Sequence, residues 1–324
     1  MSHRPFHFAV QSISARSADQ FRTRARRVED QGYRALHLAD HILGPGEAIA
    51  PTMHPIQELA AVPAMAMAAE ATQTLRIGCR VFCVDYRLPA VLAKEAATLD
   101  LLSDGRLELG MGAGWLKNEY DAIGIPFDPP LRRIERLKEV VALIKAHSRP
   151  EALELQGEHV RIHGYEGVPR PVQTPHPPIM IGGGSRRVLE LAAEQAQIVS
   201  FNFNNRSGVL GRESVQGSTP EATARKVSWV REASGDRFES LELEIGAYFV
   251  AIGEGWEAAC EGMGRVFGLE KQALCAHPHA LFGSVDAVCE ELIRRREATG
   301  IHYITVGDDV MDAFAPVVAR LAGQ

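Results

Sequence analysis

Short apolar runs alternate along this chain with longer segments whose apolar residues recur every three or four positions. The short runs are typical of buried parallel strands, and the longer pattern is typical of amphipathic helices. Eight runs are interpreted as strands, at residues 6–11, 34–39, 76–82, 106–111, 179–182, 197–203, 241–252 and 302–306. Helices are expected at residues 17–31, 56–71, 89–104, 115–123, 130–147, 220–234, 284–299 and 309–321, with a further one ending at residue 196.

This alternation predicts an α/β fold, a (β/α)8 TIM barrel with insertion segments, built as a single domain over residues 1–324. The Gly/Pro-rich loop at residues 42–55 is long for a compact domain, which makes it a candidate lid or substrate loop. The remaining segments are expected to form a surface hairpin at 153–164, an extended stretch at 168–178, a mobile polar insertion at 204–218 and an inserted helical segment at 254–282.

The rival architecture is a doubly wound open sheet that binds a dinucleotide. Gly110-Met-Gly112 begins the glycine fingerprint of that fold, at the end of a strand. Trp115 stands where the third glycine belongs, and its indole would block the close packing of helix on strand that glycine permits. The barrel is therefore the preferred interpretation.

Composition narrows the functional class. Lys and Arg number 35 against 41 Asp and Glu, so the net charge of −6 argues against nucleic acid or an anionic membrane as partner. No stretch is long enough to span a membrane, and the apolar run near the start is too short for a signal peptide. The five cysteines form no CxxC pair, which indicates reduced thiols in the cytoplasm.

Asp40 and His41 follow the second predicted strand, at the barrel face where ligands bind. His41 could exchange a proton near neutral pH, and the adjacent Asp40 carboxylate could tune it. The alternative is a loop histidine without a role. His37 and His41 lie on a strand and its exit rather than on one helix face, so no metal site is expected.

A second candidate site is the run Gly182-Gly183-Gly184-Ser185, which is followed by Arg186 and Arg187. A strand ends here, glycines expose backbone N–H groups, and a helix begins, with a hydroxyl and guanidinium groups nearby. That combination is typical of a phosphate site. The alternative is a tight strand-to-helix turn with surface arginines.

A third candidate is Gly112, Ala113 and Gly114, with Asn118 and Glu119 just beyond. Small residues let a flat ring lie against the backbone. Asn118 and Glu119 could then bond the polar edge of that ring or a phosphate tail. The alternative is that the glycines serve only the loop conformation and that Asn118 and Glu119 cap the next helix.

Together these residues resemble the luciferase-like monooxygenase superfamily, especially its branch that uses the deazaflavin coenzyme F420. The similarity covers nearly the whole chain and is most specific at residues 39–41, 87–127 and 170–184. It implies a bacterial luciferase-like barrel that binds a flavin or deazaflavin at the C-terminal ends of its strands.

The resemblance also assigns roles to residues. It places Asp40 and His41 beside the reactive face of the ring, and a non-proline cis peptide, Arg80–Val81, behind the ring. It matches Gly112 and Asn118 to ring and tail contacts, with Ala113 and Gly114 in the same loop, and Gly182, Gly183, Gly184 and Ser185 to the phosphate loop.

One departure from the family concerns the proton donor. Deazaflavin sugar-phosphate dehydrogenases carry a glutamate directly after Gly-x-Gly, where this chain has Trp115. Sugar-phosphate oxidation is therefore not supported, and His41 is left as the main candidate acid and base.

The expected function is F420-dependent oxidoreduction, with hydride transfer between C5 of the deazaflavin and a small organic substrate. The alternative is an FMN-dependent two-component monooxygenase that takes reduced flavin from a separate reductase and activates O2. A third interpretation is a non-catalytic flavin carrier. A homodimer is expected from the resemblance, and the substrate is not readable from the sequence.

Overall fold

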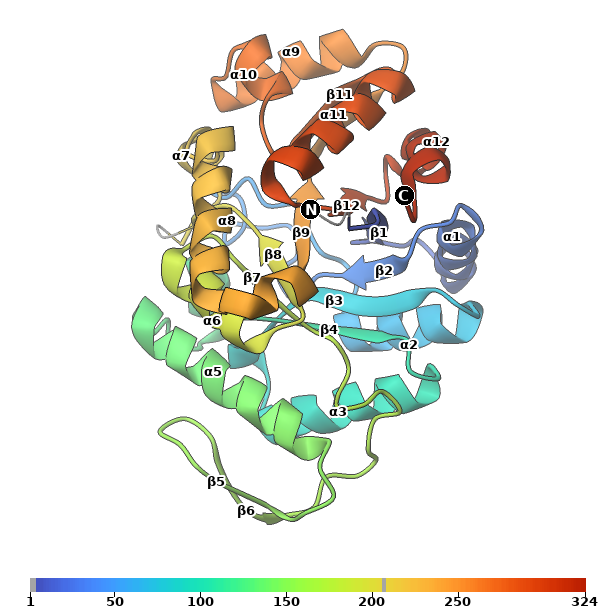
Figure 1. Cartoon of the computed structure of the whole chain (residues 1–324). Coiled ribbons are helices and arrows are strands. Elements are labelled where there is room, and N and C mark those ends of the chain that lie inside the picture. Colours follow the sequence, from blue (N-terminus) through green and yellow to red (C-terminus); the bar gives the residue numbers. More distant parts are fainter. Residues whose placement is uncertain (1–3, 206–207) are drawn as a thin grey trace.

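The computed structural model describes residues 4–205 and 208–324. In it, eight parallel strands close into a barrel, which confirms the fold expected from the sequence (Figure 1). Around the barrel the strand order is β1-β12-β9-β8-β7-β4-β3-β2, and β2 pairs back to β1. The barrel strands are β1 (His7–Gln11), β2 (Ala35–Leu38), β3 (Arg76–Cys83), β4 (Leu107–Gly112), β7 (Ile179–Gly183), β8 (Ile198–Phe201), β9 (Glu242–Ala247) and β12 (Tyr303–Gly307).

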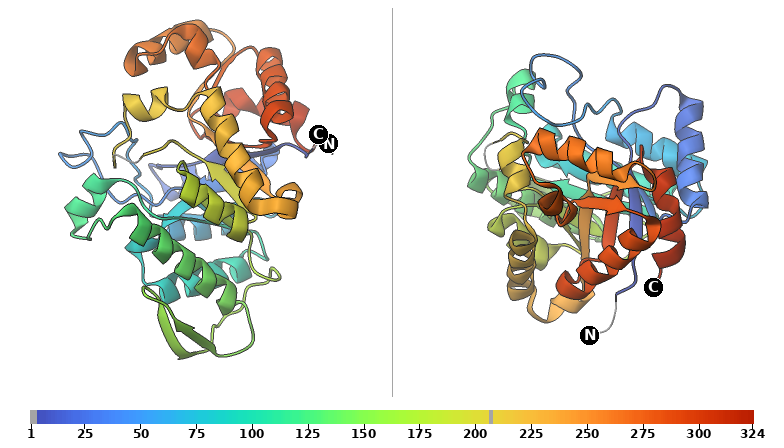
Figure 2. Two further views of the ribbon diagram at one scale, coloured as in Figure 1. Left: turned by 60° about the vertical axis from the view of Figure 1, so that its left-hand side comes forward. Right: turned by 90° about the horizontal axis from the view of Figure 1, so that it is seen from above.

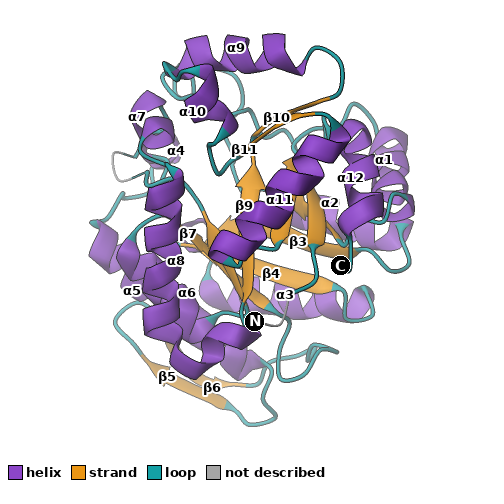
Figure 3. Cartoon of the chain, turned by 45° about the horizontal axis from the view of Figure 1, so that its top comes forward, coloured by secondary structure: helices purple, strands orange, loops and turns teal. Residues whose placement is uncertain are grey.

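Helices surround the barrel on its outside (Figure 3). They are α1 (Ala18–Asp30), α2 (Ala61–Ala71), α3 (Pro89–Leu102), α5 (Pro130–His147), α6 (Arg186–Gln195), α8 (Pro220–Ser234), α11 (Val285–Thr299) and α12 (Met311–Leu321). The connections hold α4 (Lys117–Ile123), α7 (Arg212–Gln216), α9 (Trp256–Phe267), α10 (Lys271–Cys275) and the 3-10 turns η1 (Val84–Tyr86) and η2 (Gly235–Ser240). None of the helices in the described ranges combines the length and the apolar character needed to cross a membrane.

Helix boundaries follow the local signals in the sequence. Pro89 occupies the first turn of α3, where its missing N–H costs nothing. Ser284 caps α11 by accepting a hydrogen bond from the Ala287 N–H at 3.2 Å. Gly300 ends the same helix in the left-handed conformation, with φ 79°.

The single strand predicted at residues 241–252 is wrong. The run at 241–252 divides into β9, which belongs to the barrel, and β10 (Phe249–Ile252), which leaves it. The N–H groups of Tyr248 and Phe249 both donate to the carbonyl of His279, which turns the chain away from the barrel. β10 then pairs in parallel with β11 (Ala280–Gly283), so the segment at 254–282 holds the expected helices but also ends in a strand.

Two further boundaries differ from expectation. The helix predicted from residue 56 begins only at Ala61, because the preceding backbone is extended and the Glu58 N–H donates to the carbonyl of Ile13. Of the polar insertion at 204–218, residues 206 and 207 lie outside the described residues, and the rest contains the short helix α7. The predicted hairpin is present as β5 (Leu153–Gln156) and β6 (Arg161–Tyr165).

The chain brings its two ends together at one side of the barrel (Figure 2). The Phe6 N–H donates to the carbonyl of Gln324 at 3.0 Å. Between them, β1 and β12 pair over their full lengths and close the barrel.

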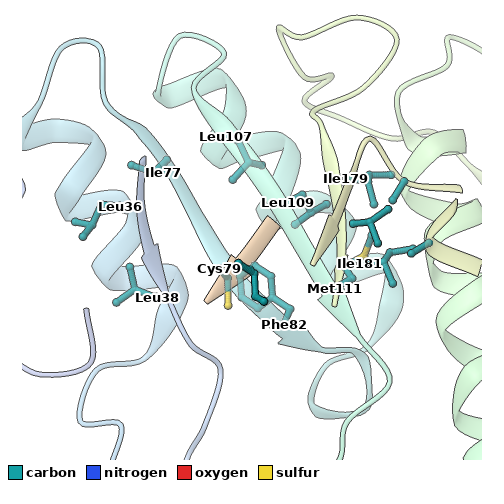
Figure 4. Packing of buried hydrophobic residues seen from close by; sticks show 14 of the residues in the cluster. Leu36, Leu38, Ile77, Cys79, Phe82, Leu107, Leu109, Met111, Ile179 and Ile181 are labelled. Carbon is teal, nitrogen blue, oxygen red and sulfur yellow. The ribbon is translucent and has the colours of Figure 1, made fainter. Parts of the chain in front are cut away.

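Barrel strands present an apolar face to the helices and a more polar face to the interior, because successive side chains point to opposite sides. Figure 4 shows the apolar layer on β2, β3, β4 and β7, formed by Leu36, Leu38, Ile77, Cys79, Leu107, Leu109, Met111, Ile179 and Ile181. Inside the barrel, Glu108 accepts from Tyr303 Oη at 2.8 Å and lies 3.2 Å from His37 Nε2 and 3.1 Å from Arg34 Nε. Burial acts to raise the pKa of Glu108, but the His37 hydrogen bond and the Arg34 charge lower it to about 2.

Candidate active site

The residues singled out from the sequence meet at one end of the barrel, where the strands reach their carboxyl ends. Asp40 and His41 follow β2, Gly112 ends β4, and Gly183 ends β7. In parallel barrels this is the face at which side chains from several strands converge on a ligand. We call this end the mouth of the barrel.

The back of the mouth is built by a bulge in β3. The register between β3 and β4 shifts between Cys79 and Phe82, and the peptide bond between Arg80 and Val81 is cis, as the resemblance implied. Val81 packs directly on glycines of β4 and β7. A Cβ on Gly112 would lie 2.7 Å from Val81 Cγ2, and one on Gly182 would lie 3.3 Å from Val81 Cγ1.

Arg80 extends from this bulge into the top of the barrel interior. Its Nε lies 2.9 Å from Glu244 Oε1, and its guanidinium also donates to Tyr248 Oη at 2.8 Å and to Asn202 Oδ1 at 3.1 Å. Burial works against the charge, but the Glu244 carboxylate and Tyr248 hold the pKa of Arg80 above its ordinary value. A permanent positive charge therefore lies below the mouth.

Tyr248, Asn202 and Glu244 did not emerge from the sequence. Asn202 and Tyr248 follow the ends of β8 and β9, and strand ends are the available signal for such residues. The signal at Tyr248 was hidden because residues 241–252 resemble one continuous strand.

His41 pairs with Glu119 rather than with its neighbour Asp40. His41 Nδ1 lies 2.9 Å from Glu119 Oε2, and the same oxygen accepts from Tyr86 Oη at 2.7 Å. The other oxygen accepts from the Ile42 N–H. Burial would raise the pKa of Glu119, but these hydrogen bonds, that of His41 first, hold it below its ordinary value.

Glu119 is therefore an ionised acceptor with a fully buried side chain. Because a carboxylate accepts and cannot donate, His41 carries a proton on Nδ1 and its Nε2 is left to act toward a ligand. From the sequence, Glu119 was a candidate either to contact a ligand or to cap the next helix. Instead, Glu119 orients His41, while Asn118 beside it is half-buried.

Asp40 is occupied elsewhere. Its carboxylate accepts from Arg87 Nη2 at 2.8 Å and from the Cys83 N–H at 3.0 Å. These bonds join the end of β2 to the end of β3 and the start of α3. The sequence suggested that Asp40 adjusts the proton affinity of His41. In the structure the Asp40 carboxylate instead fixes the backbone behind His41.

Two aromatic side chains enclose His41. The ring of His54 lies 4.0 Å from the His41 ring, centroid to centroid, and Trp115 lies 5.7 Å from His41 and 5.5 Å from His54. His54 comes from the loop that the sequence marked as a candidate lid. Burial, and then the neighbouring His41, lower the pKa of His54 to about 3, so this wall is uncharged near neutral pH.

Hydrogen bonds from Arg133 fix the loop after β4. Arg133 Nη1 donates to the carbonyl of Ala113 at 3.1 Å and to that of Gly114. Gly114 has φ 71°, and a Cβ there would overlap the hydroxyl of Tyr120. Gly114 is therefore needed for the conformation of the loop, which was the alternative considered for it.

The glycine turn after β7 approaches the end of β8 closely. A Cβ on Gly184 would lie 2.1 Å from the carbonyl oxygen of Phe203, so only glycine fits. Ser185 is the N-cap residue of α6, and its side chain makes no capping hydrogen bond. Arg186, expected as a phosphate partner, is exposed and already pairs with Glu190 at 2.7 Å and Glu232 at 3.6 Å.

A cavity of about 270 Å³ lies away from the mouth, between α8 and α11 on the outside of the barrel wall. Its floor is apolar and includes Ile245 and Ile304. It contains none of the residues described above, and convergent polar groups are what mark a catalytic site. The mouth therefore remains the candidate site.

Comparison with known proteins gives the chain a family. Residues 3–211 match the family model described as luciferase-like monooxygenase. A curated relative, the FMNH(2)-dependent dimethylsulfone monooxygenase of Pseudomonas putida, is 32% identical over 163 residues, which are 50% of this chain and 41% of that protein. The chain thus matches about two fifths of the length of this relative.

Solved structures with the same fold include an F420-dependent reductase and a monooxygenase. The coenzyme F420 dependent tetrahydromethanopterin reductase of Methanopyrus kandleri has a TM-score of 0.75 at 17% identity, covering 98% of this chain and 99% of that one. A long-chain alkane monooxygenase has a TM-score of 0.74 at 15% identity, covering 98% and 92%. At such identities the likeness shows the fold alone. The family match covers more than half of the 324 residues, and the chain belongs to the luciferase-like monooxygenase family.

Proposed function

We propose that this chain is an F420-dependent oxidoreductase that exchanges a hydride between C5 of the deazaflavin and a small organic substrate. The observation that carries the proposal is the His41–Glu119 pair at the mouth of the barrel. A hydride transfer to or from a carbonyl or alcohol needs a companion proton transfer, and an oriented histidine supplies it.

The residues of the mouth fit a flat coenzyme with an anionic tail. Val81 packs on Gly112 and Gly182, which carry no side chains, at the back of the mouth. We place the ring there, with Asp40, Arg80, Ala113, Gly114 and Asn118 around it. Its phosphate tail would bind at Gly182, Gly183, Gly184 and Ser185, which lead from the end of β7 to the N-cap of α6. When bound, the coenzyme would supply the hydride chemistry.

The chain itself would contribute a proton relay and a dry pocket. His41 Nε2 would take a proton from a substrate hydroxyl, or return it to the developing alkoxide. Glu119 would hold the ring and stabilise the imidazolium that forms. His54 and Trp115 would exclude water on the substrate side, which strengthens each of these interactions.

A second candidate is the oxygenating component of an FMN-dependent two-component monooxygenase. The identity of 32% to an FMNH(2)-dependent monooxygenase favours it. Reduced flavin would then come from a separate reductase, and FMN would take the place of F420 beside His41.

A titration decides between the candidates. The purified chain is mixed with F420 and, separately, with FMN, and binding is followed by the absorbance and fluorescence of the coenzyme. We expect F420 to bind at one molecule per chain. Binding of FMN alone would replace the first candidate by the second, and binding of neither would overturn both.

We also propose a cytoplasmic homodimer. Leu88 and Leu102 of the α3 region are 74% and 73% exposed, and Val91 between them is 47% exposed. We propose that a second copy of the chain covers these exposed apolar side chains. Light scattering on the purified chain tests the proposal, with a mass of twice 35.4 kDa expected and a monomer contradicting it.

A further inference from the structure

Lys226 of α8 is a buried cation that the proposed chemistry does not use. Lys226 is 5% exposed, and its Nζ donates to the carbonyl oxygen of Asn202 at 2.7 Å. Among the described residues, none of the ion pairs joins Lys226 to a carboxylate, and the charge that acts on it most is that of Arg225. Buried ammonium groups are normally paired, because leaving a charge uncompensated in the interior is costly.

The Lys226 ammonium lies beside the glycine turn. The Asn202 oxygen that it contacts is 2.7 Å from the position of a Cβ on Gly184. Farther along α8, Trp229 and Glu232 contact Arg186, the first residue of α6. Lys226 precedes Trp229 by about one helical turn. It is thus level with the turn formed by Gly183, Gly184 and Ser185.

The other groups around Lys226 do not neutralise it. Burial lowers the pKa of His277 and His279, so both are uncharged near neutral pH. Arg225 is cationic, and Arg186 is already compensated by Glu190 and Glu232. Burial also lowers the pKa of Lys226 to about 8, which keeps it mainly protonated at pH 7. Lys226 is therefore a buried positive charge that none of the ion pairs among the described residues compensates, next to the turn that opens α6.

We propose that Lys226 provides the positive charge that binds the phosphate on the tail of the coenzyme at Gly183, Gly184 and Ser185. This inference rests on the proposed function and adds to it a recognition residue from a different helix. It also replaces Arg186, which the sequence suggested for that role. The phosphate would receive N–H groups from the turn and a charged hydrogen bond from Lys226.

The test compares coenzymes with and without the phosphate. Two pairs are available: FMN with riboflavin, and F420 with its phosphate-free deazaflavin core. Calorimetry measures the affinity of the chain for both members of whichever pair it binds. In Lys226→Met, affinity for the phosphate-bearing form should fall roughly 10- to 100-fold. Affinity for the phosphate-free form should stay the same. Arg225→Met, which removes an exposed neighbouring cation, is the matched control and should change neither affinity.

A second measurement uses the unaltered chain. Raising the pH from 7 to 9 should reduce the preference for the phosphate-bearing form, because Lys226 loses its charge while the phosphate keeps its own and the N–H groups of the turn remain. His277 and His279 stay neutral over this range, because burial lowers their pKa values. This comparison keeps the test valid if Lys226→Met does not fold.

The outcomes distinguish failure of the proposed function from failure of the role inferred for Lys226. If neither member of either pair binds, the proposed function fails and this inference falls with it. If a coenzyme binds but its phosphate adds no affinity, only the inference is overturned. The inference alone is also overturned if Lys226→Met weakens both forms equally, or if the phosphate preference is unchanged at pH 9.

Discussion

The imidazole of His41 donates through Nδ1 to the buried carboxylate of Glu119, which lies 2.9 Å away and 78 positions further along the chain. His41 follows β2 and Glu119 lies in α4, so only the closed barrel brings them together. The arrangement gives a histidine of fixed orientation in front of an aromatic wall. Substitutions at either residue of the pair should therefore act on the same proton transfer.

Replacing His41 by Ala should lower turnover roughly 100- to 10,000-fold, because the proton that accompanies hydride transfer loses its donor and acceptor. Coenzyme affinity should remain within about twofold, since the backbone and the glycine turn are untouched. His163, whose side chain is 89% exposed, gives a control, and His163→Ala should behave as the parent. Full turnover in His41→Ala would exclude this residue as acid and base.

Glu119→Gln preserves shape but removes the charge that orients and stabilises His41. We expect kcat to fall about 100-fold or more, with the coenzyme affinity unchanged. Tyr86→Phe removes one hydrogen bond to the same carboxylate and leaves its charge, so its kcat should fall far less. Equal losses in the two variants would show that Glu119 serves packing rather than the orientation of His41.

Gly112→Ala tests the surface on which the ring is placed. The new methyl group would lie 2.7 Å from Val81 Cγ2, so Val81 must move toward the space assigned to the coenzyme. Coenzyme affinity should fall roughly tenfold or more, as a displacement of this size disturbs a fitted site. Gly44→Ala adds the same methyl group where no atom lies within 4 Å, and it should bind normally.

The buried carboxylate of Glu108 makes stability depend on pH. Burial would raise its pKa, but His37 and Arg34 lower it to about 2, below the ordinary value of 4.5. Its contribution is therefore present above pH 4.5 and is lost as the pH falls toward 2. Glu108→Gln should lower Tm at pH 7 by roughly 5–15 °C and should flatten the fall of Tm between pH 5 and 3.

Exposed Glu297 provides the comparison for that experiment. Glu297→Gln should leave both the Tm at pH 7 and its fall in acid unchanged. If Glu108→Gln and the parent lose Tm in parallel between pH 5 and 3, Glu108 does not carry the acid sensitivity.

Much of the fold was readable because its signals are local. Pro89, Ser284 and Gly300 mark helix ends through their own backbone and side-chain chemistry, and all three act as expected. The break between β9 and β10 was not readable. It depends on hydrogen bonds from Tyr248 and Phe249 to His279, which is distant in sequence.

In the candidate site, too, residues with a local signal were identified and residues that depend on distant contacts were not. His41 and Gly112 were identified because each follows a strand, a position that the pattern reveals. The pairing of His41 with Glu119 and that of Arg80 with Glu244 were missed, since each joins residues that are distant in the sequence. Lys226 gave no signal at all, because one lysine in an amphipathic helix is indistinguishable from a surface residue until burial is known.

In the proposed function, a tricyclic redox coenzyme would lie across the mouth of the barrel, against Val81 and beside His41. The most direct measurement is a crystal structure of the chain with F420 or FMN. We predict the ring in contact with Val81, its reactive edge within hydrogen-bonding reach of a substrate held by His41 Nε2, and the phosphate at Gly183 to Ser185. A coenzyme bound elsewhere, with the mouth closed by side chains, would contradict this proposal.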